Sequence, residues 1–268
     1  MRFDFDVTQE LAPRAICTQY RESDFDFLVR LLASEGLSYR FEHDQADDGD
    51  GGDGQAKHRL VIFDSRAALP SMVGGDALRF HGVRAADTDD AIDEFAARRS
   101  VQANAVGISS WDPAQLLAPG AEQQSNVDAG DLPALAVYDG SGERIVSARQ
   151  AADTHSTLML QALELDYKVF EGAGAVRRLA AGHTFALTQH ERYPSGDNAF
   201  TVLAVEHEGR NNYQAQIKEV LLNQQKLSST GRGNDKKEIS YFCNFRLVRS
   251  WNFIYTPNAF QSIWQTND

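Results

Sequence analysis

The sequence predicts a β-dominated α+β protein with two helices. Along most of the chain, apolar and polar residues alternate in short runs, the spacing of strands whose side chains point to opposite faces of a sheet. Clusters of Gly and Asp separate these runs, as turns separate strands. Helical spacing of apolar residues is confined to the segments near residues 24–35 and 144–163. At 268 residues the chain is long enough for one large β domain or two smaller ones.

The first predicted helix follows two predicted strands, Arg2–Val7 and Ala15–Tyr20. Ser23 offers a hydroxyl for the N-cap, and aspartates occupy the first turn, where the helix dipole favours negative charge. The helix is expected to run from about Asp24 to Glu35 and to end at Gly36, which can adopt the left-handed conformation. Its apolar side chains are candidates for core packing and assembly: Phe25, Phe27, Leu28, Leu31 and Leu32.

A strand is expected directly after Gly36, because Tyr39 and Phe41 alternate with polar residues. From Asp44 to Gln55 the chain consists mostly of Asp and Gly, and is too polar to offset the entropy lost on ordering. This stretch is therefore predicted to be a mobile hairpin tip. The next strand is expected at Lys57–Asp64.

The second predicted helix covers about residues 144–163, which contain neither Gly nor Pro and place Ala152 and Met159 on one face. Residues 228–237 resemble a loop, and the aromatic-rich stretch 239–255 is expected to be extended. Further strands are predicted at Leu78–Val83, Glu94–Val101, Ala105–Trp111, Pro133–Tyr138, Glu164–Glu171, His183–Gln189 and Asn198–Glu208.

The charge balance argues against nucleic acid as a partner. Lysine and arginine total 26 against 38 aspartates and glutamates, and the net charge of −12 repels phosphates. No apolar run approaches the roughly 20 residues that span a bilayer, and the first residues lack the pattern of a signal peptide. We therefore expect a cytoplasmic origin and no membrane insertion. Cys17 and Cys243 lie in strand-like runs far apart and are expected to be reduced thiols.

No residue pattern predicts catalysis, a cofactor or a metal centre. The seven histidines form no His-Glu-x-x-His motif, and no Cys-x-x-Cys pair is present. The acidic loop 47–54 lacks the last acidic ligand of an EF-hand, and the glycines of 172–177 lack the third member of a nucleotide-binding turn. The pair Asp24 and Asp26 is explained by the start of the helix. We expect a protein that is not an enzyme and has no cofactor.

Three segments resemble the VgrG family, the spikes of type VI secretion systems. They are Gln19–His43, the Leu-x-x-Gly-x-x-Phe-x-Leu run Leu179–Leu187, and Phe200–His207, which is similar to the family pattern Tyr-x-Val-x-x-Val-x-His. The three segments occur in the order found in the family. They add six candidates for the core and for assembly: Tyr39, Phe41, Phe185, Leu187, Val202 and Val205.

The resemblance implies phage tail-hub-like β-barrels in a homotrimer, whose pseudo-sixfold ring matches the hexameric tube protein (Hcp). It also implies contacts with the spike tip and with effector proteins, a cytoplasmic location before firing, and later secretion or delivery as part of the spike. Family members begin before the strand matched by Arg2–Val7 and continue into a β-helix needle, so a partial hub is expected. Within it, residues 1–85 are assigned to one barrel, 86–255 to a second barrel region and 256–268 to a C-terminal tail.

Two other functions remain open. An effector enzyme delivered by the same machinery would carry a constellation of carboxylates or a nucleophile in a cleft. An adaptor that binds an effector or a chaperone would be a monomer, so oligomeric state separates it from a hub. The aromatic-rich C-terminal stretch fits either a contact between subunits or a last strand pair within its own domain.

Overall fold

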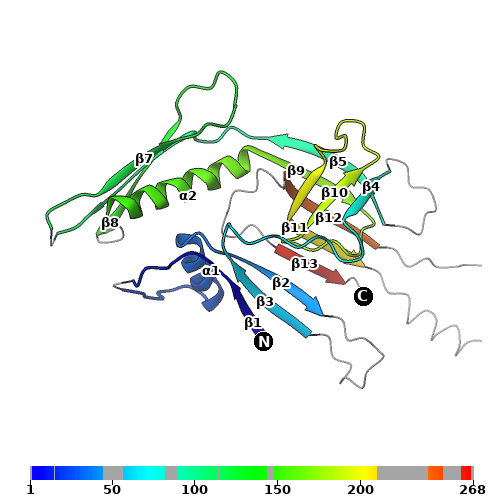
Figure 1. Ribbon diagram of the computed structural model, residues 1–268, viewed down its shortest axis with the longest axis horizontal. Helices are drawn as coiled ribbons and strands as arrows, with labels where there is room; N and C mark the ends of the chain where they lie inside the picture. Colours follow the sequence, from blue (N-terminus) through cyan, green and yellow to red (C-terminus); the bar gives the residue numbers. More distant parts are fainter. Residues whose placement is uncertain are drawn as a thin grey trace, which may run out of the picture.

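The computed structural model describes residues 2–14, 16–44, 57–81, 90–113, 115–143, 148–209, 241–249 and 261–266. They form three units: a small sheet with one helix, a β-barrel, and a second small sheet with a long helix (Figure 1). The predicted β-dominated fold with two helices is confirmed. None of the described helices is long and apolar enough to cross a membrane.

The N-terminal unit is a three-stranded sheet that carries helix α1. Strand β3 (Lys57–Phe63) lies in the middle, parallel to β1 (Arg2–Asp6) and antiparallel to β2 (Ser38–Asp44). Helix α1 spans Asp24–Ser34, within one residue of its predicted end.

Helix α1 begins and ends as its sequence predicts. The Ser23 hydroxyl accepts a hydrogen bond from the backbone N–H of Asp26 at 3.1 Å, which satisfies one of the free donors of the first turn. Gly36 has a φ of 70°, the left-handed conformation that terminates helices. Val29 and Leu32 on the buried face of the helix pack against the sheet, and such side chains contribute about 1.5 to 3 kcal/mol each.

The barrel consists of six strands that close into a ring. Their order is β10-β4-β5-β9-β12-β11, and pairing of β10 with β11 closes it. A seventh strand, β13 (Gln261–Thr266), runs parallel to the later part of β11. The irregularity between Val202 and Ala204 falls where the neighbour of β11 changes from β10 to β13. The barrel strands are β4 (Ala77–Phe80), β5 (Ala91–Arg99), β9 (Lys168–Gly174), β10 (Thr184–Thr188), β11 (Ala199–Gly209) and β12 (Tyr241–Arg249).

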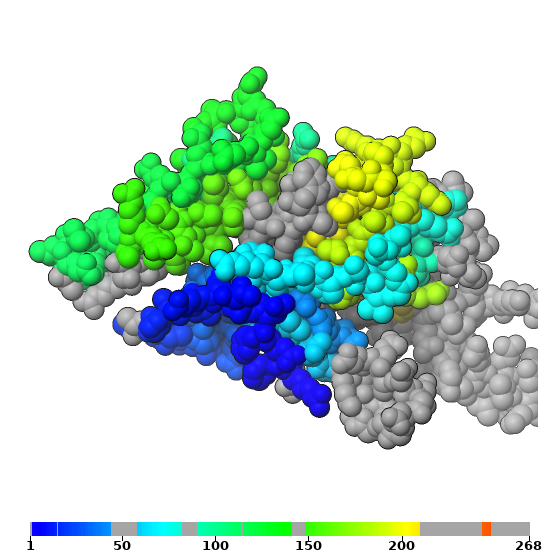
Figure 2. Space-filling model, in the orientation of Figure 1, coloured from blue at the N-terminus to red at the C-terminus, as the bar shows by residue number. Residues whose placement is uncertain are grey.

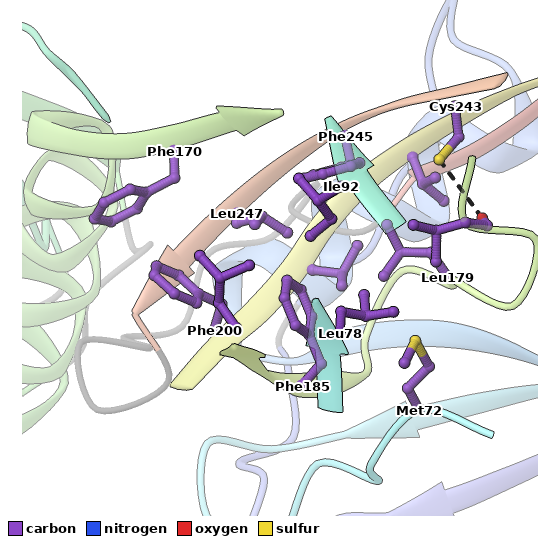
Figure 3. Close-up of a cluster of buried hydrophobic side chains, with 14 of the residues drawn as sticks. Met72, Leu78, Ile92, Phe170, Leu179, Phe185, Phe200, Cys243, Phe245 and Leu247 are labelled. Carbon is purple, nitrogen blue, oxygen red and sulfur yellow. Dashed lines mark hydrogen bonds between the residues drawn. The ribbon is translucent and has the colours of Figure 1, made fainter. Parts of the chain in front are cut away.

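Aromatic and aliphatic side chains fill the barrel (Figure 3). Phe170 and Phe200 are fully buried and meet edge to face, with ring centroids 5.0 Å apart. Phe95 stacks on Phe170 at 5.7 Å. The core draws on strands far apart in sequence, including β4, which precedes residue 86. The division of the chain at residues 85 and 255 stays a prediction.

The third unit packs helix α2 on a sheet in the order β7-β6-β8. Ala152 of the helix is fully buried against Ile108 and Ala121 of the sheet, and its small side chain allows close approach. In Figure 1 the helix lies along this sheet, beside the barrel. The elements are β6 (Ala105–Trp111), β7 (Gly120–Gln124), β8 (Ala136–Glu143) and α2 (Arg149–Tyr167).

Two local predictions were wrong, and one strand was not predicted. Residues 16–20 form no strand; Ile16 is 79% exposed, and no neighbouring strand pairs with this segment in the described structure. The residues 164–167, predicted to begin a strand, are the last turn of α2, which is displaced toward the C-terminus relative to 144–163. Strand β7 was missed, because Ala121 is its only buried side chain. The predicted mobile tip, apart from Asp44, and the predicted loop at 228–237 lie outside the described residues.

Candidate assembly surface

The sheet of the N-terminal unit has an apolar face set by strand register. Phe3 of β1, Leu60 of β3 and Phe41 of β2 lie opposite one another, so their side chains share a face. Phe5 lies two residues after Phe3 in β1, and Tyr39 lies two residues before Phe41 in β2, so both are on that same face. Helix α1 packs on this face and buries Tyr39. It leaves the side of the face formed by β1 uncovered.

Three phenylalanines of this face and one of the covering helix remain exposed, and we call the four the aromatic row: Phe3 and Phe5 of β1, Phe25 of α1 and Phe41 of β2. Their exposed fractions are 62%, 66%, 53% and 38%. The Phe3 and Phe5 rings meet edge to face at 5.8 Å, and Phe25 and Phe41 each contact the Tyr39 ring at 6.0 Å. Figure 2 shows the N-terminal residues, in dark blue, at the molecular surface. Exposed aromatic groups of this size are typical of interaction sites.

Strand β1 adds an open sheet edge to the aromatic row. All five of its residues are exposed, and among the described strands it pairs only with β3. An edge strand presents backbone N–H and C=O groups that another chain can pair with. The N-terminal unit therefore combines an apolar face with an available backbone edge.

The opposite face of the same sheet is charged and faces the barrel. Arg59 pairs with Asp4 at 3.0 Å and with Glu42, and Arg40 pairs with Glu42 at 2.8 Å. Burial opposes ionisation of Glu42, but the hydrogen bonds from Arg59 and Arg40 outweigh it and lower the pKa of this carboxyl. One face of this sheet thus carries ion-paired side chains, and the other carries apolar side chains that are partly exposed.

Arg40 also fixes the sheet on the barrel. Its guanidinium lies 5.0 Å from the ring centre of Phe63 in the same sheet, and the fully buried Phe63 packs against Val169 and Leu203 of the barrel. Gly182, just before strand β10 of the barrel, approaches Arg40 so closely that a Cβ there would lie 2.8 Å from the Arg40 Cβ. The Gly182 φ of +79° also favours glycine.

Asp64 joins the end of β3 to the segment after β1. One carboxylate oxygen accepts hydrogen bonds from the Thr8 backbone N–H at 2.6 Å, the Thr8 hydroxyl at 2.8 Å and the Gln9 backbone N–H at 2.9 Å. The other accepts the Arg66 backbone N–H at 2.9 Å. Burial opposes ionisation, but these bonds prevail and lower the pKa of Asp64 to about 2. This carboxylate holds β1, and with it the aromatic row, in place.

The buried titratable groups of the barrel region are arranged for packing. His207 is 1% exposed, its Nε2 lies 3.0 Å from the Leu179 carbonyl oxygen, and burial lowers its pKa. The Cys243 thiol lies among the buried side chains of the barrel (Figure 3) and donates to the Gly174 carbonyl at 3.2 Å and to the Val176 carbonyl at 3.5 Å. Burial raises the pKa of this thiol to about 11. Both cysteines are free, Cys17 exposed and Cys243 buried.

A groove of about 540 Å³ crosses strands β5, β9, β12 and β11. Its lining includes Glu94, Glu171 and Glu206, but no histidine, hydroxyl or thiol side chain. Glu171 is engaged by Arg98 at 3.1 Å. Among the described residues, no group of three or more His, Cys, Asp or Glu side chains is arranged to hold a metal ion. The groove thus lacks the hydroxyl, thiol or imidazole that most hydrolases use, and one of its three glutamates is held in an ion pair.

The residues predicted for core and assembly divide by exposure. Leu32, Tyr39, Phe185, Leu187, Val202 and Val205 are buried, whereas Phe27 and Leu31 are half-buried and Phe25, Leu28 and Phe41 are exposed. Their role in assembly stays a prediction. Sequence reasoning missed Phe3 and Phe5, although their alternation in the first strand was the signal that places them on one face. Phe245, from the aromatic-rich C-terminal stretch, packs inside the barrel.

Comparison with known proteins decides the family. A sequence model of the phage tail baseplate hub (GPD) family matches residues 1–213. The chain belongs to this family. It is 28% identical over 197 residues to the type VI secretion system spike protein VgrG1a of Pseudomonas aeruginosa, covering 71% of this chain and 28% of that protein. The spike protein VgrG4b of the same organism is 26% identical over 258 residues, covering 95% of this chain and 29% of that protein.

These relatives confirm the resemblance to VgrG proteins. This hub chain spans less than a third of the length of these two spike proteins. A solved tail protein from Neisseria meningitidis MC58 has the same fold, with a TM-score of 0.53 at 11% identity, covering 98% of this chain and 64% of that one. The predicted tail-hub-like fold is therefore confirmed.

Proposed function

We propose that this chain is a structural, non-enzymatic component of a type VI secretion spike hub. In this role it assembles as a homotrimer that joins the tube protein (Hcp) to the puncturing tip and helps to deliver effector proteins. The hub resides in the cytoplasm before firing and leaves the cell with the spike. Its membership in the tail baseplate hub family and its spike relatives support this function.

The observation that carries the assembly is the aromatic row beside the open edge of β1. Phe3 and Phe5 are each more than 60% exposed, and each buried phenylalanine side chain stabilises an interface by about 1.5 to 3 kcal/mol. Pairing at the β1 edge would add directional backbone hydrogen bonds to this apolar contact. We infer that a second copy of the chain covers this surface.

A hub of this kind acts by transmitting force, which requires units that are fixed to one another. The contacts of Arg40 with Phe63 and Gly182, and those of Asp64 with Thr8 and Gln9, tie the N-terminal unit together and to the barrel. They keep the proposed interface in a constant orientation relative to the barrel.

The test is the molar mass in solution, measured by light scattering after size exclusion at several concentrations. We expect a trimer for the wild type and a monomer for Phe5→Glu, because a carboxylate on this apolar face would have to be desolvated. Val101→Glu is the matched control, since Val101 is also 66% exposed but lies outside the aromatic row. It should remain a trimer.

A monomeric wild type would overturn the trimer and favour an adaptor. A trimer that survives Phe5→Glu would place the interface elsewhere. Hydrolytic activity of the purified chain toward cell-wall or protein substrates would instead favour an effector enzyme, with Glu94, Glu171 and Glu206 of the groove as the first residues to substitute.

A further inference from the structure

Two histidines face each other near the end of the β2–β3 hairpin at which the connecting sequence joins the two strands. In the antiparallel register His43 lies directly opposite His58. Both side chains are exposed, and their ring centroids are 6.0 Å apart with the planes at 64°. They occupy the same face as Phe41 and Leu60, because each lies two residues from its neighbour along the strand. The charged cluster of Arg59 and Glu42 is on the other face.

The distance between the rings suits a shared metal ion. A metal about 2.0 to 2.1 Å from an imidazole nitrogen lies roughly 3.2 Å from that ring's centre. Two imidazoles on one ion then have centres roughly 5.2 Å apart at a tetrahedral angle and roughly 6.4 Å apart when opposite each other. The observed 6.0 Å lies between these limits. No change in strand pairing is needed to bring the two rings to one ion.

We propose that His43 and His58 form a binding site for a divalent cation that prefers imidazole nitrogen, the class that includes zinc, nickel and copper. The two histidines supply two ligands, and water fills the remaining positions. Because both rings are exposed, an ion can enter without a rearrangement of the core.

The charge of the sequence favours a cation over an anion. The chain carries a net charge of −12, and the sequence that joins the two histidines contains five aspartates and one lysine. Neither His43 nor His58 forms an ion pair with an acidic side chain among the described contacts. The site as proposed consists of the two imidazoles alone.

The position of the site gives the cation a structural effect. One ligand comes from β2 and the other from β3, so a bound ion links the two strands close to the end at which they are connected. The histidines are close together only when the strands are paired, and an ion that binds the folded chain better than the unfolded chain stabilises the fold. The cation would thus stabilise the sheet that carries the aromatic row.

The experiment is calorimetric titration with zinc chloride, on chains that carry Cys17→Ser to remove the exposed thiol. We expect one site in this background, at least tenfold weaker binding in His43→Ala and in His58→Ala, and unchanged binding in the control His155→Ala. His155 lies on α2, away from the hairpin. A zinc-dependent rise in the thermal unfolding midpoint should disappear in the same two variants.

The absence of zinc binding at millimolar concentration would overturn the proposal and leave the two rings as a simple edge-to-face contact. Binding that survives both histidine substitutions would also overturn it and assign the ion to carboxylates. Circular dichroism of each variant verifies that the exposed substitutions leave the fold intact.

Discussion

At the scale of single residues, Asp64 illustrates how a buried carboxylate can stabilise a fold. It is 1% exposed, but four hydrogen bonds to its oxygens favour the ionised form. The folded pKa of about 2 lies below the ordinary value of 3.8. The carboxylate therefore contributes stability that is fully present above pH 3.8 and is lost as the pH falls toward 2.

Asp64→Asn should lower the free energy of unfolding by about 2 kcal/mol at pH 7, because a neutral amide is a weaker acceptor at a buried site. Urea unfolding measures this loss, and the difference from wild type should shrink as the pH falls below about 4. The control Thr8→Val removes only the hydroxyl donor and should cost about 1 kcal/mol. An Asp64→Asn variant as stable as wild type at pH 7 would contradict the role given to this carboxylate.

At the scale of elements, the barrel wall depends on a glycine at which two strands and an aromatic ring converge. Gly172 of β9 lies opposite Phe245 of β12 and Phe95 of β5. A Cβ on Gly172 would collide with the Phe245 ring and lie 2.8 Å from the Glu94 carbonyl oxygen. The Glu94 carbonyl and the Phe245 ring approach Gly172 so closely that its α-hydrogen fits but a methyl group does not.

Gly172→Ala should therefore destabilise the protein by about 1 to 3 kcal/mol through overpacking. Thermal or urea unfolding provides the measurement. Gly140→Ala in β8 is the control, because a Cβ there would meet only Tyr138 at an ordinary 3.7 Å, and its effect should stay within about 0.5 kcal/mol. Equal effects of the two substitutions would refute the steric explanation.

At the scale of the whole molecule, buried histidines make the fold sensitive to mild acid. Burial lowers the pKa of His183 and of His207 from the ordinary 6.5. The unfolded chain therefore binds more protons than the folded chain as the pH falls below 6.5. Their contribution to stability is fully present above that pH and declines below it.

The free energy of unfolding should thus decrease between about pH 7 and pH 5, as measured by urea unfolding. His207→Gln keeps a donor for the Leu179 carbonyl but removes the titrating group, so its stability should depend less on pH over this range. His155→Ala is the control, because it replaces a histidine on α2 that is only half-buried, and it should keep the slope of the wild type. A slope unchanged by His207→Gln would exclude His207 as its source.

Local signals in the sequence determined the first helix and much of the strand pattern. Ser23 and Gly36 define the two ends of α1 through interactions within a few residues, and alternation marks the strands β1, β2 and β6. The VgrG-like segments indicated the family that the comparisons with known proteins confirm. The predicted limits of α2 differ from the observed ones, because its N-cap residue Ala148 makes no side-chain hydrogen bond that would mark the start of the helix in the sequence.

Only the tertiary structure decided which apolar residues are buried and which form the candidate surface. Phe3 and Phe41 have the pattern of core residues, yet α1 covers only the neighbouring part of their sheet face. His43 and His58 are separated by fourteen residues in the sequence, and strand register alone brings their rings together. Periodicity specifies the face of a strand to which a side chain points, whereas coverage and proximity depend on how distant elements pack.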